Sequence, residues 1–173
     1  MFWKVEYFVR DFAKAHGPFS RVLDVGSRNI NGSVRDVINT ETFIGVDMIE
    51  GPGVDVVANG HDLASVFSEP RDHFDLITCC ETFEHDNKFW LTLEAMKKIL
   101  NPGGYLLITA PSINFFLHDF PSDYYRFTEA AFKDVFFEGF EDVHVEYYQD
   151  ENDPVKQKPN NSILGYGRKP QTT

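Results

Sequence analysis

The segment Val22–Arg35, followed by the apolar run Phe43–Asp47, constrains the fold of this chain most strongly. An apolar, β-branched run leads into Asp24 and Gly26, a polar turn follows, and the second apolar run ends in Asp47. Buried parallel strands need such apolar runs, and open α/β sheets bind ligands where their strands end. Glycine lets a ligand approach the backbone where a Cβ would collide with it. The two segments therefore predict an α/β sheet with a nucleotide pocket at the ends of two neighbouring strands.

The rest of the chain reads as strands that alternate with helices. Strands are expected at 21–25, 42–47, 54–58, 74–80, 105–110, 143–148 and 162–168. Helices are expected at 3–15, 32–39 and 63–69, after the N-caps Asp86 and Thr128, and the helix that follows Asp86 ends at Asn101-Pro-Gly-Gly104. Strands separated by helices form parallel sheets, whereas the last two strands have no helix between them. We expect an α/β, Rossmann-like fold, with a mostly parallel seven-stranded sheet, helices on both faces and a C-terminal antiparallel strand pair.

Three further blocks decide between a dinucleotide and S-adenosylmethionine (SAM), the two ligands that the first strands fit. They are His61–Leu63, Phe74–His85 and Ile99–Pro111. With the first strands, these blocks resemble the class I SAM-dependent methyltransferases, and most closely the type-11-like methyltransferase domain, over roughly residues 21–140. The Leu-Asn-Pro-Gly-Gly turn and the Glu-His after the fourth strand are the most specific matches. The glycine loop departs from the family's acid-x-Gly-x-Gly-x-Gly pattern, because only Gly26 and Gly32 remain.

Length, composition and charge limit the organisation and the partners of the chain. With 173 residues, of which 42% are hydrophobic, it can bury one substantial core, so we expect one domain at 1–168, with an N-terminal helical segment at 1–20 and a disordered tail at 169–173. The net charge of −11 and the scattered Lys and Arg disfavour a nucleic-acid partner. There is no apolar run of membrane-spanning length, no signal-peptide core and no disulfide framework. We expect a cytoplasmic monomer or homodimer without membrane attachment.

The resemblance implies a set of cofactor contacts at the ends of the strands. These are Asp24, Gly26 and Ser27 at the methionine end, Asp47 at the ribose, Met48, Asp62 and the backbone N–H of Leu63 at the adenine, and Cys80 or Glu81 offering a backbone oxygen to the amino group. The three aspartates also have structural alternatives, as a helix cap for Asp24, a turn residue for Asp47 and an N-cap for Asp62. The resemblance also implies that the loop from Ser27 to Asn31 wraps the methionine end, without a separate role for Arg28.

The segment Glu81–His85 has two competing interpretations. Its Glu-x-x-Glu-His pattern resembles a divalent-metal site of ubiquinone O-methyltransferases and small-RNA 2′-O-methyltransferases. That likeness implies Mg²⁺ held by Glu81, Glu84, His85 and a second histidine, for which His118 is available. Glu-His also follows the fourth strand in methyltransferases that need no metal, and Mg²⁺ accepts histidine only reluctantly. We therefore expect no metal, count His85 and Glu84 among the catalytic residues, and keep the Mg²⁺ site as the alternative.

The aromatic loop 111–127 lies where the family keeps its substrate lid. Its rings could stack on a flat acceptor, and Tyr125 and Arg126 are the candidate acceptor residues of this loop. Arg126 could bind a carboxylate or a phosphate of the acceptor. The structural alternative is a hydrophobic loop that packs over the edge of the sheet.

The expected function is methyl transfer from SAM to an oxygen or nitrogen of a small-molecule acceptor. The Asp/Asn-Pro-Pro-Tyr/Phe motif of amino-directed DNA methyltransferases and the Pro-Cys nucleophile of cytosine C5 enzymes are both absent. Two alternatives stay open. One is a catalytically degenerate SAM-binding domain that acts in an assembly. The other is an NAD-dependent oxidoreductase, against which the lack of Gly-x-Gly-x-x-Gly and of a separate substrate domain argues.

Overall fold

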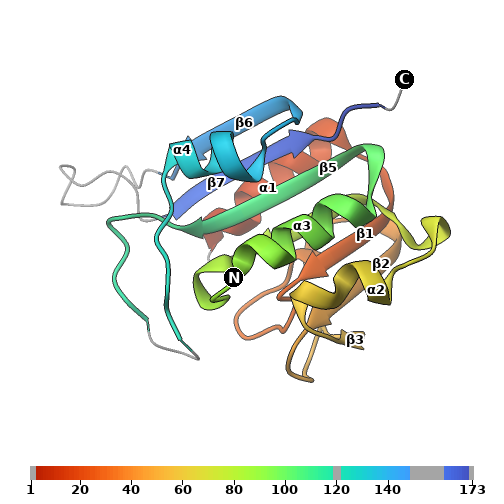
Figure 1. The fold of residues 1–173 in the computed structure, drawn as a ribbon, viewed down its shortest axis with the longest axis horizontal. Coiled ribbons are helices and arrows are strands. Elements are labelled where there is room, and N and C mark those ends of the chain that lie inside the picture. Colours follow the sequence, from red (N-terminus) through yellow and green to blue (C-terminus); the bar gives the residue numbers. More distant parts are fainter. Residues whose placement is uncertain (1–2, 119–121, 149–161, 172–173) are drawn as a thin grey trace.

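A computed structural model describes residues 3–118, 122–148 and 162–171 and has one central sheet. Its strands are β1 (Phe19–Val25), β2 (Thr40–Asp47), β3 (Val56–Val57), β4 (Phe74–Cys80), β5 (Leu100–Pro111), β6 (Glu141–Tyr147) and β7 (Ser162–Arg168). Their order is β3-β2-β1-β4-β5-β7-β6 (Figure 1). The first five strands pair in parallel, while β7 runs antiparallel to both β5 and β6. The expected seven-stranded sheet with a C-terminal antiparallel pair is confirmed.

Helices cover both faces of this sheet. The α-helices are α1 (Trp3–His16), α2 (Leu63–Val66), α3 (Phe89–Ile99) and α4 (Glu129–Ala131). Shorter turns are the 3₁₀ elements η1 (Val34–Asp36), η2 (Gly60–Asp62), η3 (Pro70–Asp72) and η4 (Phe83–His85), and the π-helical η5 (Phe132–Phe136). Helix α1 lies on one face, and α2, α3 and α4 lie on the other (Figure 1). Within the described residues, no helix is long and apolar enough to cross a membrane.

The core is divided between the two faces by the alternation of side chains along each strand. Leu23 and Ile77 belong to the cluster that packs beneath α2, α3 and α4. Their neighbours Val22 and Leu76 belong to the second cluster, which contains Val9 and the other apolar residues of α1. Successive residues of a strand point to opposite faces, so an apolar run through β1 and β4 supplies both cores at once.

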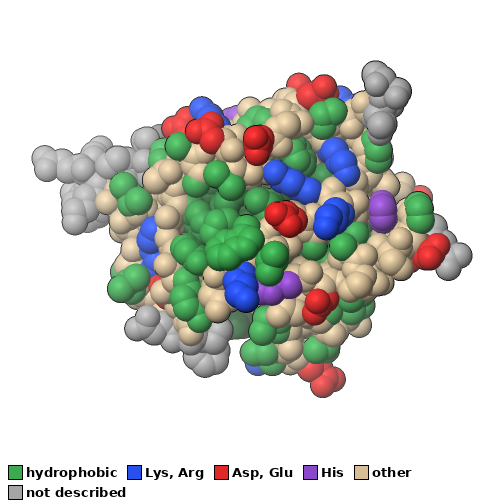
Figure 2. Space-filling model, viewed as in Figure 1, with side chains coloured by type: hydrophobic (Ala, Val, Ile, Leu, Met, Phe, Trp, Pro, Cys, Tyr) green, Lys and Arg blue, Asp and Glu red, His purple; other side chains and the backbone are tan. Residues whose placement is uncertain are grey.

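The surface over α3 and α4 is partly apolar. Figure 2 shows hydrophobic side chains gathered on this face, with Lys and Arg side chains interleaved with acidic ones beside them. Exposed apolar residues of these elements include Trp90 in α3 and Val135 in η5.

Two helix predictions are corrected by the structure. The helix expected at 32–39 is a single 3₁₀ turn, η1, in which Ser33 accepts the N–H of Arg35. The residues that flank this turn are Gly32, Ser33, Val37, Ile38 and Asn39, all of low helix propensity, and the fold gives them no second turn. Asp86 is not the N-cap of α3, because that helix begins at Phe89 and the Asp86 carboxylate accepts the N–H of Lys88 before it. The N-cap Thr128 is confirmed, since its hydroxyl accepts the N–H of Ala131 at 3.3 Å.

The expected disorder of the tail does not apply to Lys169. Its backbone N–H donates to the Gly104 oxygen at 2.8 Å. Its ammonium donates to the carbonyls of Lys97 and Leu100 at 2.8 and 2.7 Å, at the C-terminal end of α3. A cation placed there satisfies carbonyls that have no partner within the helix and complements the helix dipole. Residues 172–173 lie outside the described residues.

Candidate active site

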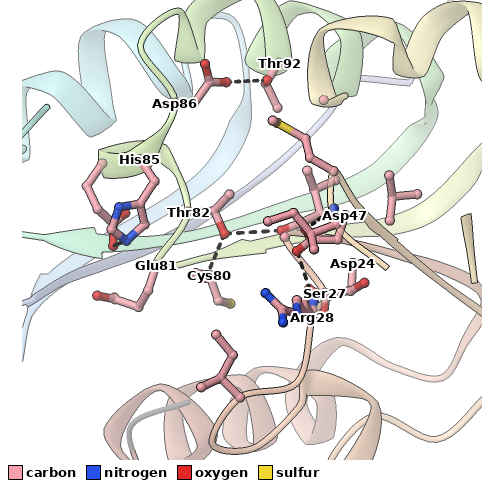
Figure 3. Close-up of a pocket in the computed structure, with 18 of the residues that line it drawn as sticks. Asp24, Ser27, Arg28, Asp47, Cys80, Glu81, Thr82, His85, Asp86 and Thr92 are labelled. Carbon is pink, nitrogen blue, oxygen red and sulfur yellow. Dashed lines mark hydrogen bonds and ion pairs between the residues drawn. The ribbon is translucent and has the colours of Figure 1, made fainter. Parts of the chain in front are cut away.

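A cavity of about 680 Å³ opens where β1, β2 and β4 end. Its wall includes Asp24 to Arg28 after β1, Val46 to Ile49 after β2, and Cys80 to Thr82 after β4. Figure 3 shows these residues converging on one space from the ends of neighbouring strands. A volume of this size accommodates a nucleotide-sized ligand. The cavity lies where the sequence predicts the nucleotide pocket.

Gly26 forms the turn that leads out of β1. Its φ is +79°, and a Cβ at this position would lie 2.1 Å from the hydroxyl of Thr82. The N–H groups of Gly26 and Ser27 both donate to the oxygen of Val46, at 2.9 and 3.1 Å, and so tie the turn to β2. The left-handed backbone and the close Thr82 side chain therefore both favour glycine at position 26, whether or not a ligand is bound.

Asp24 is a buried carboxyl group in the cavity wall. It is 4% exposed, and one of its oxygens accepts the Thr78 hydroxyl at 2.7 Å. Burial raises the pKa of Asp24 to about 7, although the Thr78 hydrogen bond acts in the opposite direction. Close to neutral pH this group therefore changes between a neutral acid and an anion that can accept hydrogen bonds from an ammonium.

Asp47 presents its carboxylate at the end of β2. One oxygen accepts the N–H of Arg28 at 3.2 Å and the other accepts the N–H of Ile49 at 2.9 Å. Each carboxylate oxygen can accept a second hydrogen bond, so the group can still bind two neighbouring hydroxyls. Met48, which follows it, is 65% exposed and lines the same cavity.

The turn after β3 corrects two predicted adenine contacts. Asp62 and Leu63 do not line the cavity, whereas Asn59, Gly60 and His61 do. In the 3₁₀ turn η2, the N–H of Asp62 donates to Asn59 and that of Leu63 to Gly60, and the Leu63 side chain is buried in the core. The N–H of Leu63 is therefore already used within the turn, and Asp62 is an exposed residue that is not part of the cavity wall.

His61 and Asp86 close one side of the cavity, and the sequence did not indicate either as a site residue. His61 Nε2 lies 2.9 Å from Asp86 Oδ1, and the Thr92 hydroxyl donates to Asp86 Oδ2 at 2.6 Å. His61 and Asp86 are 25 positions apart in the sequence, and their contact joins the turn after β3 to the segment just before α3. Only the folded chain reveals this contact.

Glu81 occupies a strained position directly after β4. Its φ is +49°, which side chains other than glycine rarely adopt. The Thr109 hydroxyl donates to Glu81 Oε1 at 3.0 Å, and burial raises the pKa of this carboxyl to about 7. Its neighbour Cys80 also lines the cavity, and its backbone oxygen accepts the Thr82 hydroxyl at 3.0 Å. Strained residues of this kind often mark functional sites.

Glu84, His85 and His118 form a cluster in the wall of the cavity. Glu84 is fully buried, and within the described residues neither of its carboxylate oxygens has a hydrogen-bond partner. Oε1 lies 3.6 Å from Nε2 of His85 and 3.7 Å from Nε2 of His118. Burial and the nearby Glu81 raise the pKa of Glu84 well above its usual value. The sequence predicted these three residues together, and the fold brings them together.

The two histidines are oriented by different partners. His85 Nδ1 lies 2.5 Å from the Ser122 oxygen, and since a carbonyl can only accept, Nδ1 carries the proton. The Nε2 of His85 is then the free lone pair that faces Glu84. His118 Nδ1 lies 3.3 Å from Asp123, whose carboxylate also accepts the His118 N–H at 2.8 Å.

This donor set fits a divalent metal. One ligand atom from each of Glu84, His85 and His118 lies within 4.8 Å of the others, and neither oxygen of the buried Glu84 has a hydrogen-bond partner among the described residues. Two imidazoles and one carboxylate suit Mn²⁺, Fe²⁺ or Zn²⁺ better than Mg²⁺. Glu81 is outside this group and is engaged with Thr109, so the four-ligand Mg²⁺ arrangement implied by the resemblance is not formed by the described side chains.

Arg126 is a clamp of the loop 111–127, which corrects its predicted role in acceptor binding. Its guanidinium forms a bidentate ion pair with Asp123. It also donates to the oxygens of Phe115 at 3.3 Å, Phe116 at 2.8 Å and Tyr125 at 2.7 Å. These bonds use all five N–H groups of an arginine. No donor is left for a carboxylate or phosphate of the acceptor.

Tyr125 is also turned away from the cavity. Its hydroxyl donates to the Asn87 oxygen at 2.9 Å, and its ring packs edge-on against Phe89 at 5.2 Å. Tyr124, which is 51% exposed, lines the cavity in its place. Of these two neighbouring tyrosines of the predicted lid, only Tyr124 therefore lines the cavity. Residues 119–121 of the loop lie outside the described residues.

Comparisons with known proteins agree with this geometry. The family model for the methyltransferase domain matches residues 4–152. A search of curated proteins found no match. Among solved structures, the N-methyltransferase NodS from Bradyrhizobium japonicum WM9 aligns with a TM-score of 0.72 at 14% identity, over 98% of this chain and 96% of NodS.

Two further structures show the same fold. A SAM-dependent methyltransferase from Archaeoglobus fulgidus has a TM-score of 0.70 at 17% identity, over 95% of this chain and 93% of that protein. The CurJ carbon methyltransferase has a TM-score of 0.67 at 15% identity, over 96% of this chain and 53% of that protein. The chain therefore belongs to the methyltransferase domain family, and it has the fold of the SAM-dependent methyltransferases.

Proposed function

We propose that this protein transfers a methyl group from SAM to an oxygen or nitrogen of a small-molecule acceptor. The observation that supports it is the single cavity that Asp47, at the end of β2, shares with the Glu84 and His85 pair after β4 (Figure 3). A carboxylate suited to a ribose and a base suited to an acceptor then lie on different sides of one space.

The cofactor would lie across the ends of the strands. Asp47 would accept the two ribose hydroxyls, and the ionised form of Asp24 would accept a hydrogen bond from the ammonium of the methionine. Asn59 and His61 would border the adenine, in place of the predicted Asp62 and Leu63. These contacts hold the sulfonium in position, which is the main contribution that a protein makes to an in-line displacement.

The transfer requires the loss of one proton from the acceptor. A lone pair of the acceptor attacks the methyl carbon, the carbon–sulfur bond breaks, and the sulfonium becomes a thioether. The Nε2 lone pair of His85 can take the proton that the acceptor oxygen or nitrogen releases. Glu84 lies 3.6 Å away, and its ionised form would favour the imidazolium that results. The backbone oxygen of Ser122 fixes the required tautomer, because it accepts a hydrogen bond from the Nδ1–H of His85.

A metal-assisted version of the same reaction is the second candidate. It is supported by the buried Glu84 carboxylate, which has no hydrogen-bond partner among the described residues, and by the convergence of His85 and His118 on it. A divalent cation bound to these three side chains would lower the pKa of an acceptor hydroxyl. In that version His85 would be a ligand and could not also accept the proton.

Two measurements test the proposed function. Thermal unfolding with SAM, S-adenosylhomocysteine or NAD should give stabilisation by the first two only. Radiolabelled SAM, supplied with a panel of small hydroxyl and amine acceptors, should then give a labelled product. Stabilisation by SAM without turnover of any acceptor would favour the degenerate binding domain, and stabilisation by NAD alone would refute the proposal.

The metal version is tested with chelator. If His85 acts as the base, EDTA leaves turnover unchanged. If a metal is bound, EDTA abolishes turnover and Mn²⁺ restores it, and Glu84→Gln has the same effect as EDTA. The variant Asp86→Asn is the matched control, because Asp86 lines the same cavity but lies outside the three-residue cluster.

A further inference from the structure

The cavity has an unusual distribution of charge. Its described wall contains five carboxyl residues, which are Asp24, Asp47, Glu81, Glu84 and Asp86. It contains one side chain with a permanent positive charge, that of Arg28. A ligand that binds here therefore meets carboxyl groups on several sides, although burial raises the pKa of Asp24, Glu81 and Glu84, and it meets a fixed cation at one point only.

The backbone of Arg28 is held in place by its neighbours. Its N–H donates to Asp47, and the N–H of the next residue, Asn29, donates to the Pro52 oxygen at 2.7 Å. The side chain packs against Gly51, where a Cβ would lie 3.0 Å from Nε and 3.1 Å from Cγ of Arg28. Position 51 thus leaves room for the arginine because it is a glycine.

The guanidinium of Arg28 has no hydrogen bond and no ion pair within the described part of the chain, although it lines the cavity. In Figure 3 it extends from the loop toward the side of the cavity where Cys80 lies, away from Asp24. Two other arginines of the chain are paired internally, Arg35 with Asp55 and Arg126 with Asp123. A half-buried guanidinium without an internal partner is available to an anion.

The loop itself gives a second reason to assign a role to this side chain. In the acid-x-Gly-x-Gly-x-Gly pattern that the loop resembles, Arg28 stands at the second glycine position, counted from Asp24 and Gly26. The chain has thus replaced a residue without a side chain by the longest cation. SAM carries two positive groups, the sulfonium and the ammonium, and one negative group, the carboxylate of its methionine. The acids of the wall can complement the positive groups in their ionised forms, and among the lining residues Arg28 alone has a permanent positive charge for the carboxylate.

We propose that Arg28 binds the carboxylate of the cofactor's methionine, through the fork of its guanidinium, and so makes cofactor affinity depend on that carboxylate. The inference rests on the proposed function, because it requires SAM in this cavity. It assigns a specific cofactor contact to a loop residue for which the family resemblance implies no separate role.

The test compares three ligands by calorimetry. They are SAM, decarboxylated SAM, which lacks only the carboxylate, and 5′-methylthioadenosine, which lacks the whole amino-acid end. The quantity compared is the ratio of the affinity for SAM to the affinity for decarboxylated SAM. Arg28→Gln should lower this ratio by about 10- to 100-fold, the usual effect of a charged hydrogen-bond partner. It should leave the affinity for 5′-methylthioadenosine within about twofold of that of the unaltered protein.

Three variants serve as controls. Arg28→Lys keeps the charge without the fork and should give an intermediate ratio. Asp47→Asn should weaken the binding of all three ligands together, because they share the ribose. Arg35→Gln removes an arginine that is paired with Asp55 and lies outside the cavity wall, so it should leave the ratio unchanged.

The possible failures are distinguishable. Equal losses for the three ligands in Arg28→Gln would mean that the side chain only supports the loop, and would overturn the inference. An unchanged ratio with a raised KM for the acceptor would assign Arg28 to an acceptor anion and would overturn it as well. If the unaltered protein bound none of the three ligands, the proposed function itself would be refuted.

Discussion

Replacing Asp24 by Asn should raise the stability of the protein at alkaline pH and lower its affinity for the cofactor. The carboxyl is buried in the cavity wall, accepts the Thr78 hydroxyl at 2.7 Å, and has a pKa raised by burial to about 7. In the unfolded chain its pKa is near 3.8. The native protein therefore holds a proton over a pH range in which the unfolded chain has lost it.

The sign and the size of the effect follow from linkage. A pKa that folding raises gives stability that is complete below about pH 4 and is lost as the pH rises through about 7. The difference between 3.8 and about 7 is about 3 pKa units, and at 1.36 kcal/mol for each unit the ionised form costs about 4 kcal/mol. Asn cannot ionise, so Asp24→Asn should gain up to about 4 kcal/mol over the unaltered protein at pH 8 and almost nothing near pH 4.

Urea unfolding at pH 4, 6 and 8 measures this gain, with Asp36→Asn as the control because Asp36 is an exposed acid in the same part of the chain. Calorimetry at pH 8 should show weaker SAM binding by the same variant, since the amide cannot supply the anionic oxygen for the ammonium. If Asp24→Asn were less stable than the unaltered protein at pH 8, or had the same pH dependence, the assignment of the raised pKa would be refuted.

Three further substitutions test other parts of the structure. Asp47→Ala should weaken SAM binding by about 1.5–3 kcal/mol while the fold survives, and unchanged affinity in calorimetry would contradict the ribose assignment. Arg126→Ala should release the loop 111–127, so acceptor turnover falls at least about tenfold while SAM affinity stays within about threefold; equal losses of both would place the loop in the cofactor site. Lys169→Met should lower the free energy of unfolding by about 1–2 kcal/mol, because the carbonyls at the end of α3 lose a charged donor, and an unchanged urea midpoint would show that this contact contributes nothing.

Much of the fold depends on interactions between residues close in the sequence, and this part could be predicted from the sequence. The bounds of β4, Phe74–Cys80, and the N-cap at Thr128 are examples, because an apolar run and a capping hydroxyl act on residues within a few positions. The convergence of Asp24, Asp47 and Cys80 was also predictable, since the ends of parallel strands meet at one edge of a sheet. The helix expected at 32–39 failed because propensity is a weak signal over one or two turns.

The availability of the site residues to a ligand could not be predicted from the local sequence. Asp62 and Arg126 have the chemistry of ligand-binding residues, yet the first lies in a 3₁₀ turn outside the cavity wall and the second is fully paired within its loop. Arg28 has the same chemistry as Arg126, and its guanidinium is free of internal partners in the described chain. Glu84 meets His118 only because the loop after β5 returns over η4. The sequence alone determined which polar groups stand at the end of each strand. Tertiary structure decided which of them remain available for a ligand, because a donor or acceptor already paired within the protein has little left to offer.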